Sequence, residues 1–415
     1  MKLQLNHSQQ KFLFLLGITA IYTALIVSHN FLDGPKLGDE GHFWKTSLTF
    51  SDRLIPTIDS LRNYGELNTP LPFIIYGVLE YFFHQGIFAG RLLNLILSLS
   101  MVFIIGFPSR DKGTRAILCA IGLFVCPSFI RHGALLYTDL MACFWVLMGF
   151  VSYIRSRHLL SCIAFILAIA SRQYMLAFPA AIAFYEFIVV FRNSKNLREF
   201  NLANQWRWIA PSIAALSIFG WIYLFQGLAP ETAIENVAPE VQKNTWTLQA
   251  GGAINFLAFV GLYIVLPEFF LFSPVVKLQV MLKSLKQHQR KIILIAAGLL
   301  LFFLVFPPFL IGWGKLMQIV YLLPSDILKF ALLYSLSLLT CLRFSQPNLM
   351  SLVVLFNTLI MLKAYPWEKY IMPLAVVFWY LKSVGLEQQF NIFKQQGLAL
   401  TKDNTALPSL SSQGK

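Results

Sequence analysis

Long runs of apolar residues recur along almost the whole chain, and they constrain its fold more than any other feature. A transmembrane helix needs about 20 predominantly apolar residues to cross the hydrocarbon core of a bilayer. The chain is 57% hydrophobic and only 13% charged, whereas soluble domains average about 45–50% apolar and about 25% charged residues. A soluble enzyme, a secreted domain and a disordered chain are therefore excluded, and the sequence predicts a multi-pass membrane protein.

The apolar runs predict an all-α fold, a polytopic bundle of about twelve transmembrane helices. The expected spans are 12–29, 91–107, 114–130, 134–154, 158–171, 174–191, 208–226, 252–272, 292–311, 326–342, 349–363 and 370–384. The apolar segment 71–88 is short and carries Glu80 and His84, so we expect an interfacial or re-entrant helix there. One transmembrane domain is expected over 1–384, with an outer loop and interfacial helix at 30–90, followed by a cytoplasmic polar tail at 385–415.

The distribution of Lys and Arg predicts the orientation of the chain in the membrane. Cytoplasmic loops of membrane proteins carry an excess of these residues. With both ends in the cytoplasm, most of the 33 Lys and Arg residues fall on that side, including the basic stretches 192–207 and 273–291. If 71–88 were a span, both stretches would lie outside. The net charge of +14 is therefore explained by membrane topology, and nucleic acid is not an expected partner.

The sequence offers no sign of a metal site, a disulfide framework or a soluble cofactor. The five cysteines lie in or beside apolar runs without a CxxC pair, which is typical of small core residues. No group of His, Cys and carboxylate residues has metal-ligand spacing. A glycine-rich phosphate loop and a Ser-His-Asp signature are also missing from the sequence.

Several ionisable or polar residues should gather at the outer end of the bundle. They are Asp39, Glu40, His42, Arg91, Asp139, Arg172, Gln173, Glu368 and Lys369. Charge at membrane depth is costly and usually faces a cavity or a partner. Simpler interpretations stay open for some of them: Arg91 and Lys369 could extend to the membrane interface, and Asp139 could cap its helix.

An acidic pair on an outer loop, with cations at the membrane surface, suits sugar transfer from a lipid-phosphate donor. The isoprenoid chain would lie between helices, and the phosphate would face Arg or Lys. Inverting displacement at the anomeric carbon needs one carboxylate as general base. The alternative is a flippase or transporter for a lipid-linked sugar, which also uses intramembrane charge. A structural or partner-binding subunit would not explain the clustered outer charges.

Six motifs occur in an order that resembles a known family. They are GDEGHFWKTS, NTPLPFIIYG, RLLNLILS, CPS followed by LLYTDL, SRQYML and PWEKYIMPL. Together, over about residues 37–380, they resemble the dolichyl-phosphate-glucose alpha-1,2-glucosyltransferase family of the C-type glycosyltransferase superfamily. The resemblance implies an enzyme that moves a hexose, expected to be glucose, from a polyprenyl- or dolichyl-phosphate donor to a lipid-linked or envelope glycan, with inversion, on the outer or lumenal face.

The resemblance also implies roles for individual residues. Asp39 would be the general base, and Glu40 would position the acceptor or act in its place. Donor phosphate or sugar would be bound by Arg91, Arg172, Gln173 and Lys369, of which Lys369 stands where the family has Arg; Asp139, Glu368 and His42 would support the site. We expect a bacterial inner membrane, with the endoplasmic reticulum as the alternative. The one N-glycosylation sequon, Asn6-His7-Ser8, falls on the cytoplasmic side, which fits either membrane.

Overall fold

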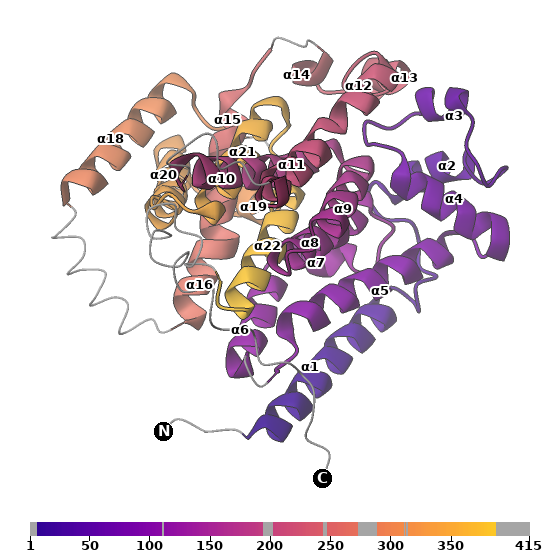
Figure 1. The fold of residues 1–415 in the computed structure, drawn as a ribbon, viewed down its shortest axis with the longest axis horizontal. Coiled ribbons are helices and arrows are strands. Elements are labelled where there is room, and N and C mark those ends of the chain that lie inside the picture. The colour runs from indigo at the N-terminus through magenta and orange to yellow at the C-terminus, as the bar shows by residue number, and fades with distance from the viewer. Residues whose placement is uncertain are drawn as a thin grey trace.

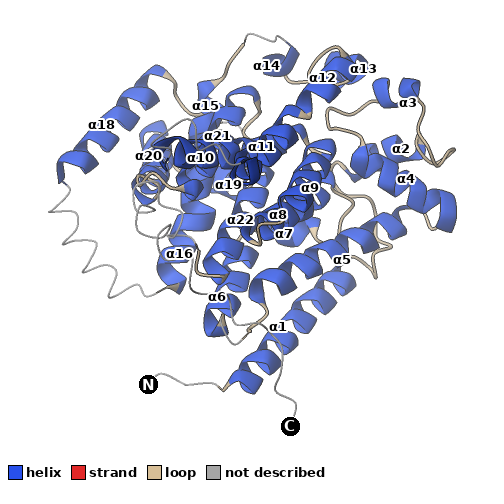
Figure 2. Cartoon of the chain, in the orientation of Figure 1, coloured by secondary structure: helices blue, strands red, loops and turns tan. Residues whose placement is uncertain are grey.

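A computed structural model describes residues 6–109, 112–193, 202–243, 247–272, 289–310, 312 and 314–386. Regular structure in these residues is helical, and they contain no strand (Figures 1 and 2). The prediction of an all-α bundle is therefore confirmed for this part of the chain. The predicted tail 385–415 lies almost wholly outside the described residues, as does most of the basic stretch 273–291.

The first half of the chain contributes a long N-terminal helix, several short helices of the predicted outer loop, and the helices that form the core. They are α1 (His7–Ser28), α2 (Glu40–Leu48), α3 (Ile58–Arg62), α4 (Leu71–Phe83), α5 (Ile87–Gly106), α6 (Gly113–Phe124), α7 (Pro127–His132), α8 (Thr138–Ile154), α9 (His158–Ser171), the 3-10 helix η1 (Gln173–Leu176) and α10 (Ala177–Asn193). The expected helix at 71–88 corresponds to α4.

The second half continues the bundle and ends on a buried helix. Its elements are α11 (Leu202–Leu216), α12 (Ile218–Phe225), α13 (Glu231–Val237), α14 (Glu240–Lys243), α15 (Ala250–Val260), the π-helix η2 (Gly261–Val265), α16 (Leu266–Leu271), α18 (Gln289–Val305), α19 (Lys315–Leu322), α20 (Asp326–Arg343), α21 (Leu349–Ile360), the 3-10 helices η3 (Met361–Lys363) and η4 (Glu368–Ile371), and α22 (Met372–Ser383).

Five helical segments among the described residues are long and apolar enough to cross a membrane. They are His7–Ser28, Ile87–Gly106, Gln173–Arg192, Gln205–Phe225 and Ala250–Leu271. Other expected spans coincide with shorter helices: α9 has 14 residues and would extend about 21 Å, less than the roughly 30 Å core of a bilayer. The protein is thus a helical bundle with several membrane-length helices, and the count of twelve crossings stays a prediction.

Proline and local backbone changes divide some expected spans into separate helices. Pro127 opens α7, so the predicted run 114–130 is divided between α6 and α7. Proline lacks the backbone N–H that would continue the preceding helix, but it fits the first turn of a new one.

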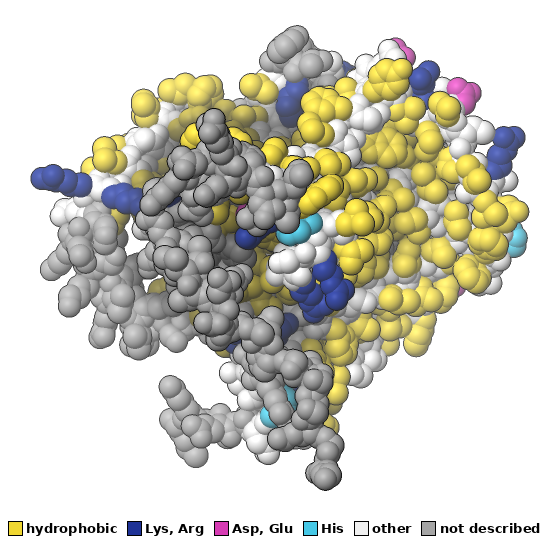
Figure 3. All heavy atoms as spheres, in the orientation of Figure 1, with side chains coloured by type: hydrophobic (Ala, Val, Ile, Leu, Met, Phe, Trp, Pro, Cys, Tyr) yellow, Lys and Arg dark blue, Asp and Glu magenta, His cyan; other side chains and the backbone are white. Residues whose placement is uncertain are grey.

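The core of the bundle is formed by helices buried on nearly all sides. α8 packs against α9, α5 and α22, and nearly every residue of α8 and α22 is buried. Peripheral helices behave differently: on α18, Leu294 and Leu304 are about three-quarters exposed. Figure 3 shows hydrophobic side chains spread across much of the described part of the face in view. An apolar exterior of this extent is expected where lipid covers the protein.

Helix ends that the predicted threading places on the cytoplasmic side lie close together. Lys11 of α1 stands 5.7 Å from the ring centroid of Phe107, just after α5. Arg115 of α6 donates a hydrogen bond from Nε to the carbonyl oxygen of Ser383, at the end of α22, over 3.1 Å. The first, second, third and last expected spans therefore have one end in common, as the threading requires.

Candidate functional site

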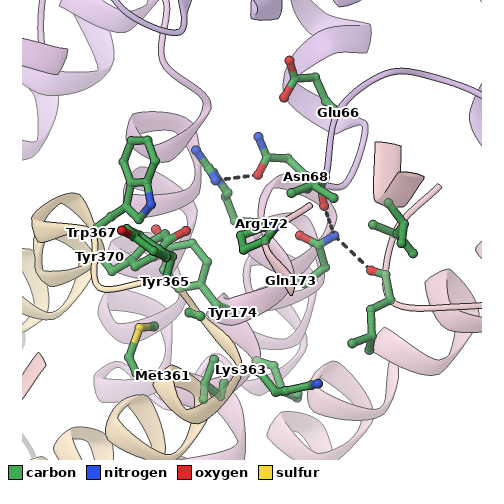
Figure 4. A pocket seen from close by; sticks show the side chains of 18 of the residues that line it. Glu66, Asn68, Arg172, Gln173, Tyr174, Met361, Lys363, Tyr365, Trp367 and Tyr370 are labelled. Carbon is green, nitrogen blue, oxygen red and sulfur yellow. Dashed lines mark hydrogen bonds between the residues drawn. The ribbon is translucent and has the colours of Figure 1, made fainter. Parts of the chain in front are cut away.

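A cavity of about 680 Å³ brings together residues from the segment 30–70, predicted as the first outer loop, and from η1, α12, α13, η3 and η4 (Figure 4). Its charged and amide side chains are Asp39, Glu66, Asn68, Arg172, Gln173, Lys363 and Lys369. Its apolar lining includes Leu176, Ile218, Phe219, Trp221, Ile222, Leu228, Ile234, Val237, Leu248, Leu359, Ile360 and Met361. The cavity therefore combines a polar group of side chains with an extensive apolar wall.

Asp39 is held at the cavity by its backbone as well as by its side chain. Its N–H donates to Tyr137 Oη over 3.1 Å. The preceding Gly38 has φ +60°, and a Cβ there would lie 2.5 Å from Tyr137 Oη, so only glycine allows this approach. The carboxylate then meets Lys369, with 3.0 Å between Oδ2 and Nζ.

Lys369 extends from η4 into a group of aromatic rings and the Asp39 carboxylate. Its Nζ lies 4.5 Å from the ring centroid of Trp367 and 5.6 Å from that of Tyr137. Such cation–π contacts fix the direction of the ammonium group without neutralising its charge. Lys369 can therefore present a positive charge to an anion in the cavity.

Arg172 lies at the end of α9, where the chain turns into η1. Its Nη2 donates to Asp139 Oδ2 and its Nη1 to Asn68 Oδ1, each over 2.5 Å. Asp139 also accepts a hydrogen bond from Tyr174 Oη at 2.9 Å. The buried Nε of Arg172 has no hydrogen-bond partner among the described residues. The guanidinium is thus oriented by its buried partners and retains one unused donor.

The amide side chains of the cavity tie the outer loop to neighbouring helices. Gln173 Nε2 donates to the carbonyl oxygens of Leu67, at 2.5 Å, and Leu228, at 3.3 Å. The carbonyl oxygen of Asn68 accepts a hydrogen bond from Tyr64 Oη at 2.6 Å. The loop carrying Glu66 is therefore fixed on both sides of that residue.

Glu66 lines the cavity but was not among the predicted site residues. Its partly buried carboxylate has no hydrogen-bond or ion-pair partner in the described part of the chain. The pKa of Glu66 is raised to about 7, because burial and the negative charge of Asp39 raise it by more than Arg172 and Lys369 lower it. A carboxyl group that titrates near neutral pH inside a cavity is a candidate for acid–base work.

Glu40 and Arg91, two of the predicted site residues, lie outside the cavity in a closed ion pair. Arg91 Nε and Nη2 donate to the two Glu40 carboxylate oxygens at 2.9 and 2.8 Å. The other Arg91 donors reach the carbonyl oxygens of Leu32, Gly34 and Pro35. Both side chains are fully buried. This placement differs from the expected contact of Arg91 with a donor phosphate, because each of its N–H groups is already used within the fold.

The remaining predicted residues divide between the cavity and its surroundings. His42 lines the cavity. Glu368 does not: its Oε2 accepts the backbone N–H of Leu316 at 3.0 Å, at the start of α19. Asp139 is not part of the cavity lining and orients Arg172 by accepting a hydrogen bond from its Nη2. Sequence reasoning therefore found Asp39, His42, Arg172, Gln173 and Lys369 of the cavity lining and missed Glu66.

The described residues contain no group of three or more His, Cys, Asp or Glu side chains suited to a metal ion.

Comparisons with known proteins give little further information. No family model matches the chain, and no curated protein matches it. Among solved structures, the chain is similar to ArnT from Cupriavidus metallidurans bound to undecaprenyl phosphate, with a TM-score of 0.40 and 15% sequence identity over 90% of this chain and 77% of that chain. The family resemblance of the sequence motifs stays a prediction.

Proposed function

We propose that the protein is an inverting membrane glycosyltransferase that uses a polyprenyl-phosphate-linked sugar. The observation that carries this proposal is the cavity itself, in which an apolar wall adjoins cations and carboxylates. An isoprenoid chain needs the first kind of surface, and a phosphate next to a reacting sugar needs the second. The transferred sugar is expected to be a hexose, with glucose favoured by the motif resemblance.

The donor phosphate would be bound by Lys369 and Arg172. Lys369 has a directed ammonium group, and Arg172 lines the same cavity with a guanidinium whose buried Nε has no hydrogen-bond partner among the described residues. Positive charge at this place stabilises the phosphate as it takes up the electron pair of the breaking glycosidic bond. The apolar residues of α12 and η3, such as Trp221 and Met361, would contact the isoprenoid chain.

A carboxylate of the cavity would take the proton of the acceptor hydroxyl. Two are available: Asp39, which the sequence motifs favour, and Glu66. Glu40 is not included in this role because it is buried in its pair with Arg91. The acceptor would be a lipid-linked or envelope glycan, reached from the outer face of a bacterial inner membrane or the lumenal face of the endoplasmic reticulum.

The proposal is tested by sugar transfer in a defined system. Purified protein in nanodiscs receives polyprenyl-phosphate-linked glucose, mannose and other sugars with a panel of lipid-linked and free glycans, and products are followed by mass spectrometry. We expect transfer by the wild-type protein. The variant Asp39→Asn/Glu66→Gln should lose it while still binding polyprenyl phosphate, and Glu235→Gln, a change on the exposed face of α13, is the matched control.

Two results would contradict the proposal. One is undiminished transfer by the double variant, because the site would then need neither carboxylate. The other is no transfer from any donor by wild-type protein that is folded and binds the lipid, which would favour the flippase alternative.

A further inference from the structure

Asp39 and Glu66 share one cavity but differ in how their charge is used. Asp39 is engaged, with Oδ2 at 3.0 Å from Lys369 Nζ. The carboxylate of Glu66 has no polar partner in the described residues, although its loop is fixed by Asn68 and Gln173. Figure 4 shows Glu66 beside Asn68, which binds Arg172. Glu66 therefore has both carboxylate oxygens available to a bound molecule, whereas Asp39 has only Oδ1 outside its ion pair.

The charges around Glu66 favour reversible protonation. Asp39, Arg172 and Lys369 face it from the first outer loop, the end of α9 and η4. The neighbouring Tyr64 is buried and neutral, and it donates its hydroxyl proton to the carbonyl oxygen of Asn68. Burial and Asp39 outweigh the two cations, so the pKa of Glu66 rises to about 7. A general base works best when its pKa lies near the working pH.

We propose that Glu66 is the general base that deprotonates the acceptor hydroxyl, and that Asp39 is a positioning residue that orients Lys369 toward the donor phosphate. This inference rests on the proposed glycosyltransferase function and adds to it the assignment of the two carboxylates. The family motifs do not contain Glu66, so the assignment depends on the cavity alone.

The chemical step balances with these groups. The acceptor O–H bond breaks, and its proton moves to a Glu66 carboxylate oxygen. The acceptor oxygen forms the new bond to the anomeric carbon as the bond from that carbon to the phosphate oxygen breaks. The electron pair of the breaking bond remains on the polyprenyl phosphate, whose additional negative charge is stabilised by the positive charges of Lys369 and Arg172.

The test is the pH dependence of kcat/KM, which reports the pKa of an essential base in the free enzyme. For wild-type protein we expect kcat/KM to rise with pH through an apparent pKa of about 7. Glu66→Gln should lower kcat by about 100- to 10,000-fold. Its remaining activity should not show this rise with pH, which we call the ascending limb of the profile. Donor binding should be kept, and Glu235→Gln should match wild type in both rate and profile. A Glu66→Gln variant with the wild-type rate and profile would overturn the assignment without affecting the proposed function.

Glu66→Asp keeps the test valid if the glutamine variant does not fold. The shorter side chain retains a carboxylate but moves it, so we expect a lower kcat that still depends on pH. A Glu66→Asp variant with lower kcat and no dependence on pH would count against a base at this position.

Asp39→Asn separates the two acids. Removing its negative charge should move the limb to lower pH, because Asp39 raises the pKa of Glu66. It should also raise the KM for the donor, since Lys369 loses the group that orients it. If the limb instead disappears in Asp39→Asn and persists in Glu66→Gln, Asp39 is the base and the assignment is wrong.

Discussion

The Nζ of Lys369 lies 3.0 Å from Oδ2 of Asp39, although 330 positions separate the two residues in the sequence. The pair joins the first outer loop to the 3-10 helix that precedes α22. The lysine side chain is 11% exposed and the aspartate side chain 34%, so the pair faces the cavity through its acid. Both residues line the cavity, so an anion that enters it meets the carboxylate of Asp39 as well as the ammonium group of Lys369.

Replacing Lys369 should weaken donor binding more than folding. Lys369→Met removes a charged hydrogen-bond donor worth about 1.5–3 kcal/mol, so we expect the Kd for polyprenyl phosphate to rise about 10- to 150-fold. Lys369→Arg should lose less, because it retains the charge. Binding can be followed by tryptophan fluorescence, since Trp367 stacks on Lys369. Lys329→Met, a change in a surface ion pair of α20, is the control. An unchanged Kd in Lys369→Met would remove this residue from the phosphate site.

Replacing Arg172 should affect stability as well as binding. Arg172→Met leaves the fully buried Asp139 carboxylate without its cation, and breaking a buried ion pair in this way costs about 3–5 kcal/mol. We therefore expect a clear fall in Tm. Asp139→Asn/Arg172→Met should recover part of it, because no buried charge is left alone.

The same two variants separate the structural role of Arg172 from its role in binding. Measured well below the Tm, both should bind polyprenyl phosphate more weakly than wild type, because each lacks the positive charge of Arg172 at the cavity. If the double variant regains wild-type affinity together with stability, Arg172 acts through the fold and not on the donor.

Most of the helices could be predicted from the sequence because each is a local property of an apolar run. The expected spans 91–107 and 158–171 coincide closely with α5 and α9. The division of 114–130 could not be placed from hydropathy alone, since it depends on Pro127. The length of each helix relative to the bilayer thickness also depends on how the helices pack against one another, and a run of apolar residues in the sequence carries no information about that packing.

The site was harder to predict because its pairings are long-range. Charge and position placed Asp39, Arg172 and Lys369 at one end of the bundle, and they meet there. The ion pair between Glu40 and Arg91 could not be inferred from the sequence. An acid and a base that form a buried structural ion pair are of the same residue types as an acid and a base that bind a substrate. Glu66 gave almost no signal: it is a lone acid in a loop, two residues before the motif that starts at Asn68.

The Glu40–Arg91 pair should be structural. Arg91→Met leaves Glu40 buried without a cation and frees the carbonyl oxygens of the loop before α2, so we expect a loss of about 3–5 kcal/mol in the free energy of unfolding. Glu40→Gln should also destabilise the protein, because Arg91 is then the unpaired buried charge. Chemical denaturation of both variants, compared with Lys329→Met, measures the effect. Full stability of Arg91→Met with complete loss of donor binding would instead restore the role that the sequence suggested for it.

Glu66 should make the stability of the protein depend on pH in a predictable direction. In the unfolded chain its pKa is near 4.5, and in the fold burial raises it to about 7. Between these values the folded state holds the proton more often than the unfolded state, so the free energy of unfolding falls as pH rises from 4.5 through 7. Glu66→Gln removes this component, because glutamine does not titrate. As pH rises across this range, the Tm of Glu66→Gln should therefore increase relative to the Tm of wild type. Glu235→Gln should show no such trend. Parallel Tm curves for Glu66→Gln and wild type would mean that the fold does not raise this pKa, and the general base would then have to be sought in Asp39.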